Sequence, residues 1–117
     1  METIGERVKR LNAMVLEGRT MEAFDQFYHP DVVMQENDNA PTVGKEANRQ
    51  RELEFLSNVT DFRGAEVRDV IAGDDISMVV WHYDYTHKEW GVRNYTQASV
   101  QHWKDGLIVK EQFFYGI

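Results

Sequence analysis

The stretch WKDGLIVKEQFFY, residues 103–115, decides how the C-terminal part of the chain folds. Its Asp105-Gly106 pair is a strong signal for a β-hairpin. A strand after this turn places Glu111 on the same face as three apolar or aromatic residues, Val109, Phe113 and Tyr115. A carboxylate on an apolar face costs free energy unless it is paired or protonated, so this glutamate requires an explanation.

Two loop lengths are compatible with the turn, and they differ in the residue that Trp103 faces. A two-residue loop puts Trp103 on the face of Ile108, whereas a three-residue loop with a bulge puts it opposite Leu107, on the inward face. We favour the three-residue loop because it gathers the apolar side chains on one face and the charged ones on the other. This register directs three polar side chains inward: Ser99, Gln101 and Glu111.

Length and composition restrict the classes of protein. The 117 residues fit one domain, and 42% hydrophobic residues suffice for a core. The net charge of −7, from 20 acidic and 13 basic residues without a basic cluster, argues against a nucleic-acid partner. The chain has no cysteine, which excludes disulfides and thiolate metal sites.

The sequence also lacks targeting signals that we recognise. No apolar run approaches the roughly 20 residues of a membrane span. Residues 1–10 are charged and amphipathic, without the apolar region of a signal peptide. We therefore expect a cytoplasmic protein with no membrane partner.

The hydrophobic pattern predicts three helices. In residues 2–17 apolar side chains recur at spacings of three and four, and Gly18 is placed to end that helix. Thr20 is expected to cap the second helix and Pro30 to stop it. A third helix is predicted at residues 45–58.

The remaining segments read as strands. They are predicted at residues 32–37, 62–73, 76–87, 92–103 and 107–115. All but the first follow the helices as a series of antiparallel hairpins, a meander. Helices followed by such a meander indicate an α+β fold.

Three segments carry a resemblance to a known family: FYHPDVVMQEN, VGKEANRQRELEFL and WKDGLIVKEQFFY. In their order and spacing the chain resembles the nuclear transport factor 2-like superfamily, and within it the SnoaL-like branch, named for polyketide cyclases. The resemblance covers nearly the whole chain, so residues 1–117 are treated as one SnoaL-like domain. It implies a cystatin-like cone, with N-terminal helices packed on a curved, mainly antiparallel sheet that encloses a pocket. It also implies a homodimer formed through the outer sheet face.

Enzymes of this fold provide site patterns for comparison. Ketosteroid isomerases use a tyrosine and two aspartates, and an ungapped match places Leu11, Gln35 and Ser99 there, so we expect no steroid isomerisation. Epoxide hydrolases use an Asp-Arg-Asp arrangement, which Asp84 and Arg93 imitate in part. Scytalone-type dehydratases use a His-Asp pair with tyrosines, residue types that the chain also contains.

Glu111 is the leading catalytic candidate. Apolar neighbours raise the pKa of a carboxyl group towards neutrality, as a general acid or base requires. The alternative is a structural glutamate that is hydrogen-bonded to a tyrosine, an arginine or a buried water.

His82 and Asp84 are the other catalytic candidates. They share one face of the strand at 76–87, and three aromatic residues, Trp81, Tyr83 and Tyr85, share the other. Either face can point inward. We favour His82 and Asp84 inside, because Ile76, Met78 and Val80 have the same parity. There they would form an acid–base cluster with Glu111.

Five further residues are expected to contact a ligand: Glu36, Ser99, Gln101, Trp103 and Tyr115. Glu36 ends a strand where this fold opens its pocket, and the Tyr115 hydroxyl needs a partner such as Glu111. The four histidines lack metal-binding spacing, so neither a metal nor another cofactor is expected.

These observations predict a pocket for a small hydrophobic or aromatic molecule, with acid–base chemistry of the cyclase, isomerase or dehydratase kind. The alternative is a ligand-binding or protein-interaction module without turnover. A third class, a structural accessory domain, would have its pocket filled by side chains.

Overall fold

The computed structural model describes residues 2–116, and within them helices and strands follow the order expected for an α+β fold. The helices are α1 (Ile4–Leu16), α2 (Thr20–Phe27) and α3 (Lys45–Ser57). The strands are β1 (Tyr28–Glu36), β2 (Thr42–Val43), β3 (Val59–Ala72), β4 (Ile76–His87), β5 (Gly91–Lys104) and β6 (Leu107–Tyr115). None of the helices among these residues is long and apolar enough to cross a bilayer.

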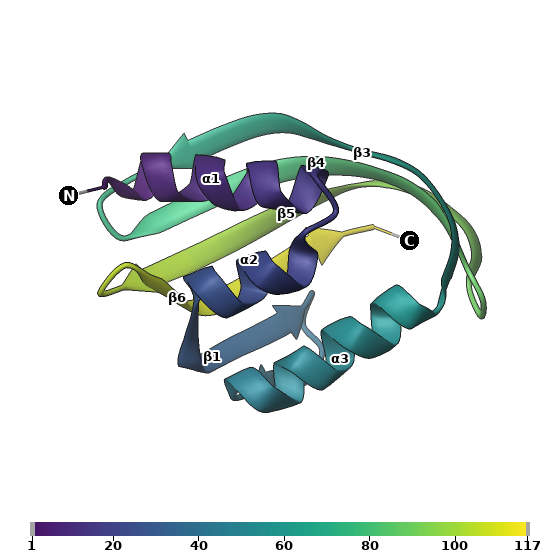
Figure 1. Cartoon of the computed structure of the whole chain (residues 1–117), viewed down its shortest axis with the longest axis horizontal. Helices are drawn as coiled ribbons and strands as arrows, with labels where there is room; N and C mark the ends of the chain where they lie inside the picture. The colour runs from purple at the N-terminus through teal and green to yellow at the C-terminus, as the bar shows by residue number, and fades with distance from the viewer. Residues whose placement is uncertain (1, 117) are drawn as a thin grey trace.

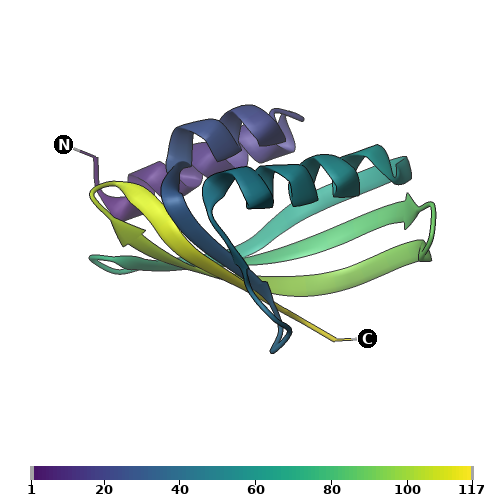
Figure 2. The ribbon, with the colours of Figure 1, turned by 90° about the horizontal axis from the view of Figure 1, so that it is seen from below.

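The strands of residues 2–116 form one six-stranded mixed sheet in the order β2-β1-β6-β5-β4-β3. Strand β1 runs parallel to β6, and the other neighbouring pairs are antiparallel. The sheet is curved, and all three helices lie on one side of it (Figures 1 and 2). This arrangement confirms the predicted cystatin-like architecture and separates an inner sheet face from an outer one.

The first two helices close one side of the core. Helix α1 begins with a capping box between Thr3 and Glu6 and buries Val8 and Leu11. Its end at Gly18, which has a φ of 81°, agrees with the predicted glycine stop. The prediction that Thr20 caps α2 is wrong: Thr20 is the first helical residue, and the capping position is held by Arg19 without a side-chain bond.

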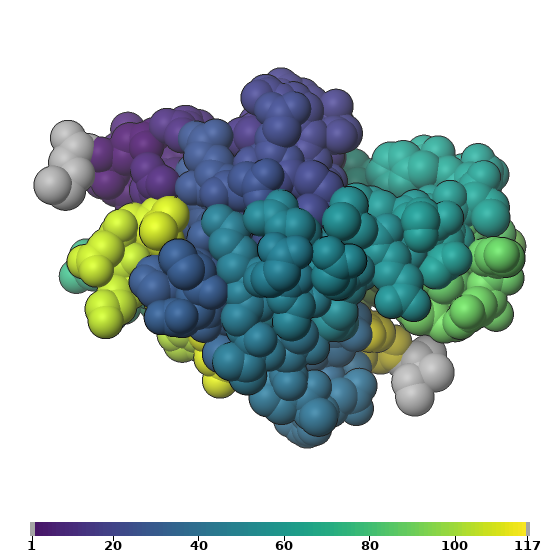
Figure 3. Space-filling view, turned by 60° about the horizontal axis from the view of Figure 1, so that its bottom comes forward, coloured from purple at the N-terminus to yellow at the C-terminus, as the bar shows by residue number. Residues whose placement is uncertain are grey.

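The start of helix α3 is held by a buried polar side chain. Its fully buried residue, Asn48, donates from Nδ2 to the backbone carbonyls of Val32, Thr42 and Gly44 at 3.2, 3.0 and 2.8 Å. These bonds attach the start of α3 to β1 and β2, and near the other end of the helix the Phe55 ring packs edge-on against Tyr85 of β4 at 5.5 Å. Figure 3 shows α3, in teal, across the middle of this face of the molecule, with α2 beside it.

The β5–β6 hairpin differs from the predicted one. Lys104 pairs with Leu107, so the loop has two residues, and both Asp105 and Gly106 have positive φ, as a type I′ turn requires. The predicted three-residue loop is therefore wrong. Trp103 pairs with Ile108, and it is Ile108, not Leu107, that is fully buried.

A β-bulge in β6, just after the turn, makes Glu111 point inward as predicted. His102 pairs with Lys110 although Trp103 pairs with Ile108, so Val109 is the extra residue. Beyond it, Glu111 pairs with Gln101. The parity is thus the one expected from the sequence, although a turn and a bulge together produce it.

Replacing Gly106 with Ala tests the turn. We expect a loss of about 1 kcal/mol in unfolding free energy, because a Cβ is strained at its φ of 78°. Gly64→Ala in β3 is the control, since an added Cβ there meets open space and no positive φ. Urea denaturation measures both variants, and equal losses would contradict the assignment of the turn.

Candidate functional site

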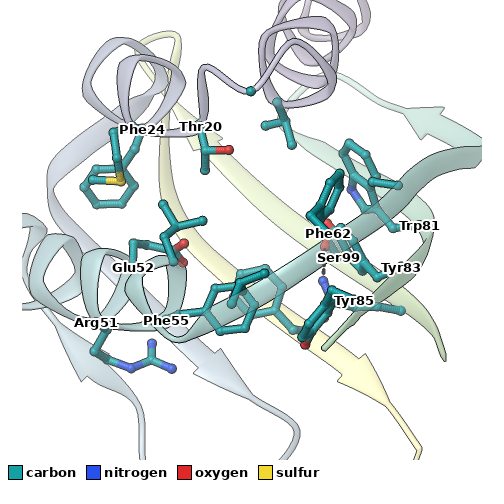
Figure 4. Close-up of a pocket in the computed structure, with 18 of the residues that line it drawn as sticks. Thr20, Phe24, Arg51, Glu52, Phe55, Phe62, Trp81, Tyr83, Tyr85 and Ser99 are labelled. Carbon is teal, nitrogen blue, oxygen red and sulfur yellow. Dashed lines mark hydrogen bonds between the residues drawn. The ribbon is translucent and has the colours of Figure 1, made fainter. Parts of the chain in front are cut away.

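The main cavity lies between the helices and the inner face of the sheet, and its volume is about 1000 Å³. Residues from α3 and α2 form one side, and aromatic residues of β4 form the other (Figure 4). Within the described residues, ten Phe, Tyr and Trp side chains contribute to the lining. Such an aromatic cavity with few polar groups has the character of a small-molecule site.

Glu111 lines this cavity and has only 2% of its surface exposed. The hydroxyl of Tyr28 donates to its Oε1, and Gln101 Nε2 donates to its Oε2 at 2.8 Å. Burial raises the pKa of Glu111 to about 7, although both hydrogen bonds act to lower it. The predicted inward position of Glu111 is confirmed.

A chain of buried hydrogen bonds fixes the orientation of Gln101. Trp103 Nε1 donates to Ser77 Oγ at 2.8 Å, and Ser77 Oγ donates to Gln101 Oε1 at 2.6 Å. An indole N–H can only donate, so the direction of the whole chain follows from Trp103. The amide N–H of Gln101 must then point at Glu111.

This direction restricts where Glu111 can carry a proton. Its Oε2 already accepts an N–H from Gln101, so a proton on that oxygen would oppose the donor. The remaining position is Oε1, which faces Tyr28, a hydroxyl that can donate or accept. Proton exchange at Glu111 is therefore directed to Oε1.

The partner of Glu111 is a tyrosine, but not the one expected. Tyr115 donates instead to Glu36 Oε1 at 3.1 Å, and burial with the Glu36 charge raises its pKa to about 12. Tyr28 is buried beside Glu111, and desolvation followed by the Glu111 charge raises its pKa well above 10. Tyr28 therefore stays a neutral donor at physiological pH.

A second carboxylate that sequence reasoning missed, Glu52 of α3, points into the same cavity (Figure 4). Desolvation raises its pKa, and nearby Arg51 acts in the opposite direction. Its charge also raises the pKa of Glu111. Glu52 precedes Phe55 by three residues, so the two side chains share one face of the helix. This spacing is a sequence signal from which the inward position of Glu52 could have been predicted.

His82 and Asp84 do not reach the cavity, so their predicted inward placement is wrong. The His82 ring lies 3.1 Å from Thr96 Oγ1 and 2.8 Å from Asn94 Oδ1 on the outer face. Asp84 accepts from Arg63 Nε at 2.9 Å. The acid–base cluster of these residues with Glu111 does not form.

The aromatic face of β4 is the inner one. Trp81 and Tyr85 are 4% and 3% exposed, because their large apolar surfaces gain more from burial than Met78 and Val80 do. Arg93 pairs with Tyr85 on β4, one position from Asp84, so Asp84 and Arg93 face opposite sides of the sheet. The partial epoxide-hydrolase pattern is therefore not assembled.

The five predicted ligand contacts divide into two groups. Glu36, Ser99 and Gln101 line the cavity. Trp103 and Tyr115 do not line the cavity. They form hydrogen bonds to other side chains, Trp103 to Ser77 and Tyr115 to Glu36. Within residues 2–116, no group of three His, Asp or Glu side chains is placed to hold a metal ion.

Comparison with known proteins agrees with this architecture. The family model of the SnoaL-like domain matches residues 8–111. The chain belongs to the SnoaL-like domain family. No curated protein sequence matches this SnoaL-like chain.

Solved structures share the fold of this SnoaL-like domain. A protein assigned as a SnoaL-like polyketide cyclase from Mesorhizobium loti has a TM-score of 0.88 at 24% identity, over 97% of this chain and 100% of that one. A cystatin-like protein from Xanthomonas campestris has a TM-score of 0.86 at 13% identity, over 99% and 92%. A nuclear transport factor 2-like protein from Burkholderia pseudomallei has a TM-score of 0.82 at 12% identity, over 99% and 92%. At these identities the likeness shows the fold alone.

Ser77→Ala tests the hydrogen-bond chain. Without the Ser77 hydroxyl, Gln101 loses the contact that orients its amide, so its donation to Glu111 weakens and the pKa of Glu111 rises above about 7. Carboxyl ¹³C NMR of labelled protein, from about pH 5 to 9, measures the shift.

Ser99→Ala is the matched control, because Ser99 is equally buried but bonds Gln97 instead. We expect the pKa of Glu111 to be unchanged in that variant. An unchanged pKa in Ser77→Ala as well would show that the chain does not tune Glu111.

Proposed function

We propose that this protein performs acid–base chemistry on a small hydrophobic or aromatic molecule bound in the cavity, with Glu111 as the group that transfers the proton. The observation that carries the proposal is a buried carboxyl group that lines an aromatic cavity and accepts hydrogen bonds from two neutral donors. Burial raises the pKa of this group to about 7. Such a group is present in both protonation states at neutral pH, so it can take up and return a proton.

The geometry supports a cyclase- or isomerase-like sequence of steps. Ionised Glu111 accepts a proton at Oε1 from a C–H bond next to a carbonyl group, which leaves an enolate. Returning that proton to another carbon gives an isomer. Attack of the enolate carbon on a second carbonyl carbon of the same molecule forms a ring, and the resulting alkoxide takes the proton from Glu111.

Tyr28 and Gln101 support these steps in different ways. Tyr28 stays protonated and stabilises the Glu111 carboxylate, whereas the fixed Gln101 amide keeps the transferable proton on Oε1. The aromatic lining excludes water from around the enolate. The family match, and the polyketide-cyclase assignment of the Mesorhizobium loti protein, are consistent with this class of reaction.

Hydrogen–deuterium exchange of an aromatic ketone, 2-tetralone, tests the proposal without knowledge of the natural substrate. We expect the protein to accelerate exchange at the acidic C–H roughly a hundredfold over buffer, and Glu111→Gln to abolish this acceleration. Ser99→Ala, which changes another residue of the lining, should retain it. NMR measures the rates.

The same experiment separates an enzyme from a binding module. Equal exchange rates with wild-type protein and Glu111→Gln would contradict the catalytic role. If the ketone binds and exchange stays at the buffer rate, the cavity serves for ligand binding without turnover.

We also propose that the protein is a homodimer formed through the outer sheet face. Ile71 and Phe114 on this face are 62% and 43% exposed. Strand pairing places Ile71 beside Met78, and Val80 and Phe114 on either side of Ala98. This apolar band is the kind of surface that a partner covers.

Light scattering at micromolar concentration tests the dimer. We expect a mass of twice the 13.7 kDa chain, and Phe114→Glu should reduce it to one chain by placing a charge in the band. Leu53→Glu is the control, because Leu53 is similarly exposed, at 44%, but lies on α3, on the other side of the sheet, so the mass should be unchanged. A wild-type protein with the mass of a single chain would contradict this proposal.

A further inference from the structure

The cavity wall carries an excess of negative charge. Within the described residues, seven glutamates and two arginines line it. Both arginines are already neutralised by neighbours at the rim: Arg19 by Glu17 at 3.1 Å and Glu22 at 2.9 Å, and Arg51 by Glu36 at 2.9 Å. No arginine or lysine side chain of the lining is left to receive an anionic ligand.

Four of the glutamates have no ion-pair partner among residues 2–116: Glu54 and Glu89 are exposed, whereas Glu52 and Glu111 face the interior. Glu111 accepts hydrogen bonds only from the neutral groups of Tyr28 and Gln101. Glu52 makes no ion pair or hydrogen bond within the described part of the chain, although its carboxylate points into the cavity (Figure 4). Arg51, the neighbouring cation, is bound to Glu36 instead.

The charges of these two carboxylates interact across the same cavity. The charge of Glu52 disfavours ionisation of Glu111, of Tyr28 and of Tyr83. Bringing a positive charge into the cavity would relieve this repulsion and pair a partly desolvated carboxylate. A negative charge in the cavity would add to the repulsion between the carboxylates.

The opposite wall also suits a cation. Trp81 and Tyr83 are stacked with ring centres 5.4 Å apart, and both line the cavity across from Glu52 (Figure 4). Aromatic faces attract organic cations, and they do so more strongly where water is excluded. A carboxylate facing an aromatic wall is the combination that binds ammonium groups in an apolar setting.

We infer that the cavity selects an organic cation, a protonated or quaternary amine carried on an aromatic or branched apolar body. The cationic group lies beside Glu52, and the apolar body lies against the aromatic residues of β4. This inference rests on the proposed function only in placing the ligand in this cavity, and it adds the charge class of the ligand.

Three probes of similar size separate charge from shape. Phenyltrimethylammonium is a cation, tert-butylbenzene is its neutral counterpart of the same shape, and benzenesulfonate is an anion. At about pH 8, above the pKa of Glu111, we expect the cation to bind about tenfold tighter than the neutral probe. The anion should bind more weakly than either. Tryptophan fluorescence, to which Trp81 and Trp90 of the cavity lining contribute, or calorimetry measures the affinities.

Matched variants locate the charge that is responsible. Glu52→Gln should weaken cation binding roughly fivefold or more and leave the neutral probe unchanged. Glu54→Gln is the control, because it removes the same charge from the same helix at an exposed position of the rim. We expect almost no effect of that change on either probe.

Several results would overturn the inference: equal affinities for the cation and the neutral probe, no cation binding up to about 10 mM, or equal effects of Glu52→Gln and Glu54→Gln. The outcome is independent of proton transfer. Cation selectivity without ketone exchange would overturn only the catalytic proposal, and ketone exchange without cation selectivity would overturn only this inference.

Discussion

Burial of the Glu111 carboxylate on an otherwise apolar strand face is the constraint on which the functional architecture depends. A charge in this position requires donors, and two distant elements supply them: Tyr28 at the start of β1 and Gln101 on β5. Gln101 in turn depends on Ser77 and Trp103 for its orientation. Four strands are therefore linked to one carboxyl group. Its pKa is about 7 because desolvation raises the pKa by more than the two hydrogen-bond donors lower it.

The surrounding fold makes this arrangement accessible to a ligand. Helix α3 is attached at its first turns by Asn48 and near its C-terminal end by Phe55, and between these contacts it forms one wall of the cavity. The sheet curves around the same space (Figure 2). The remaining volume, about 1000 Å³, leaves Glu111 facing a cavity and not a packed core.

Local patterns in the sequence were sufficient for most of the fold. The predicted strand at 76–87 and the predicted helix at 45–58 agree with β4 and α3 almost to the residue. Alternation along β6 placed Glu111 inside, because a period of two carries that information. Alternation could not predict which face of β4 points inward, because both faces carry apolar residues. Whether the aromatic or the aliphatic face is buried depends on tertiary packing.

The partners of Glu111 lay beyond the reach of local patterns. Tyr28 is 83 residues away in sequence and meets Glu111 through the parallel pairing of β1 with β6. The residue spacing that identifies a helix face contains no information on such a long-range contact. Glu52 is different, because its place on the Phe55 face of α3 is visible in the sequence. It was missed since charged residues on helices usually face solvent.

The most direct measurement is the unfolding free energy as a function of pH, for wild-type protein and Glu111→Gln at the same protein concentration. With a folded pKa of about 7 against 4.5 when exposed, the native state binds more protons than the unfolded chain between these values, so wild-type stability falls as pH rises through this window. The account predicts that wild type loses on the order of 3 kcal/mol more than Glu111→Gln between about pH 4 and 8, with no further difference above about pH 8. The same pH dependence in both proteins would contradict the account, because Glu111 would then be an ordinary, fully compensated carboxylate.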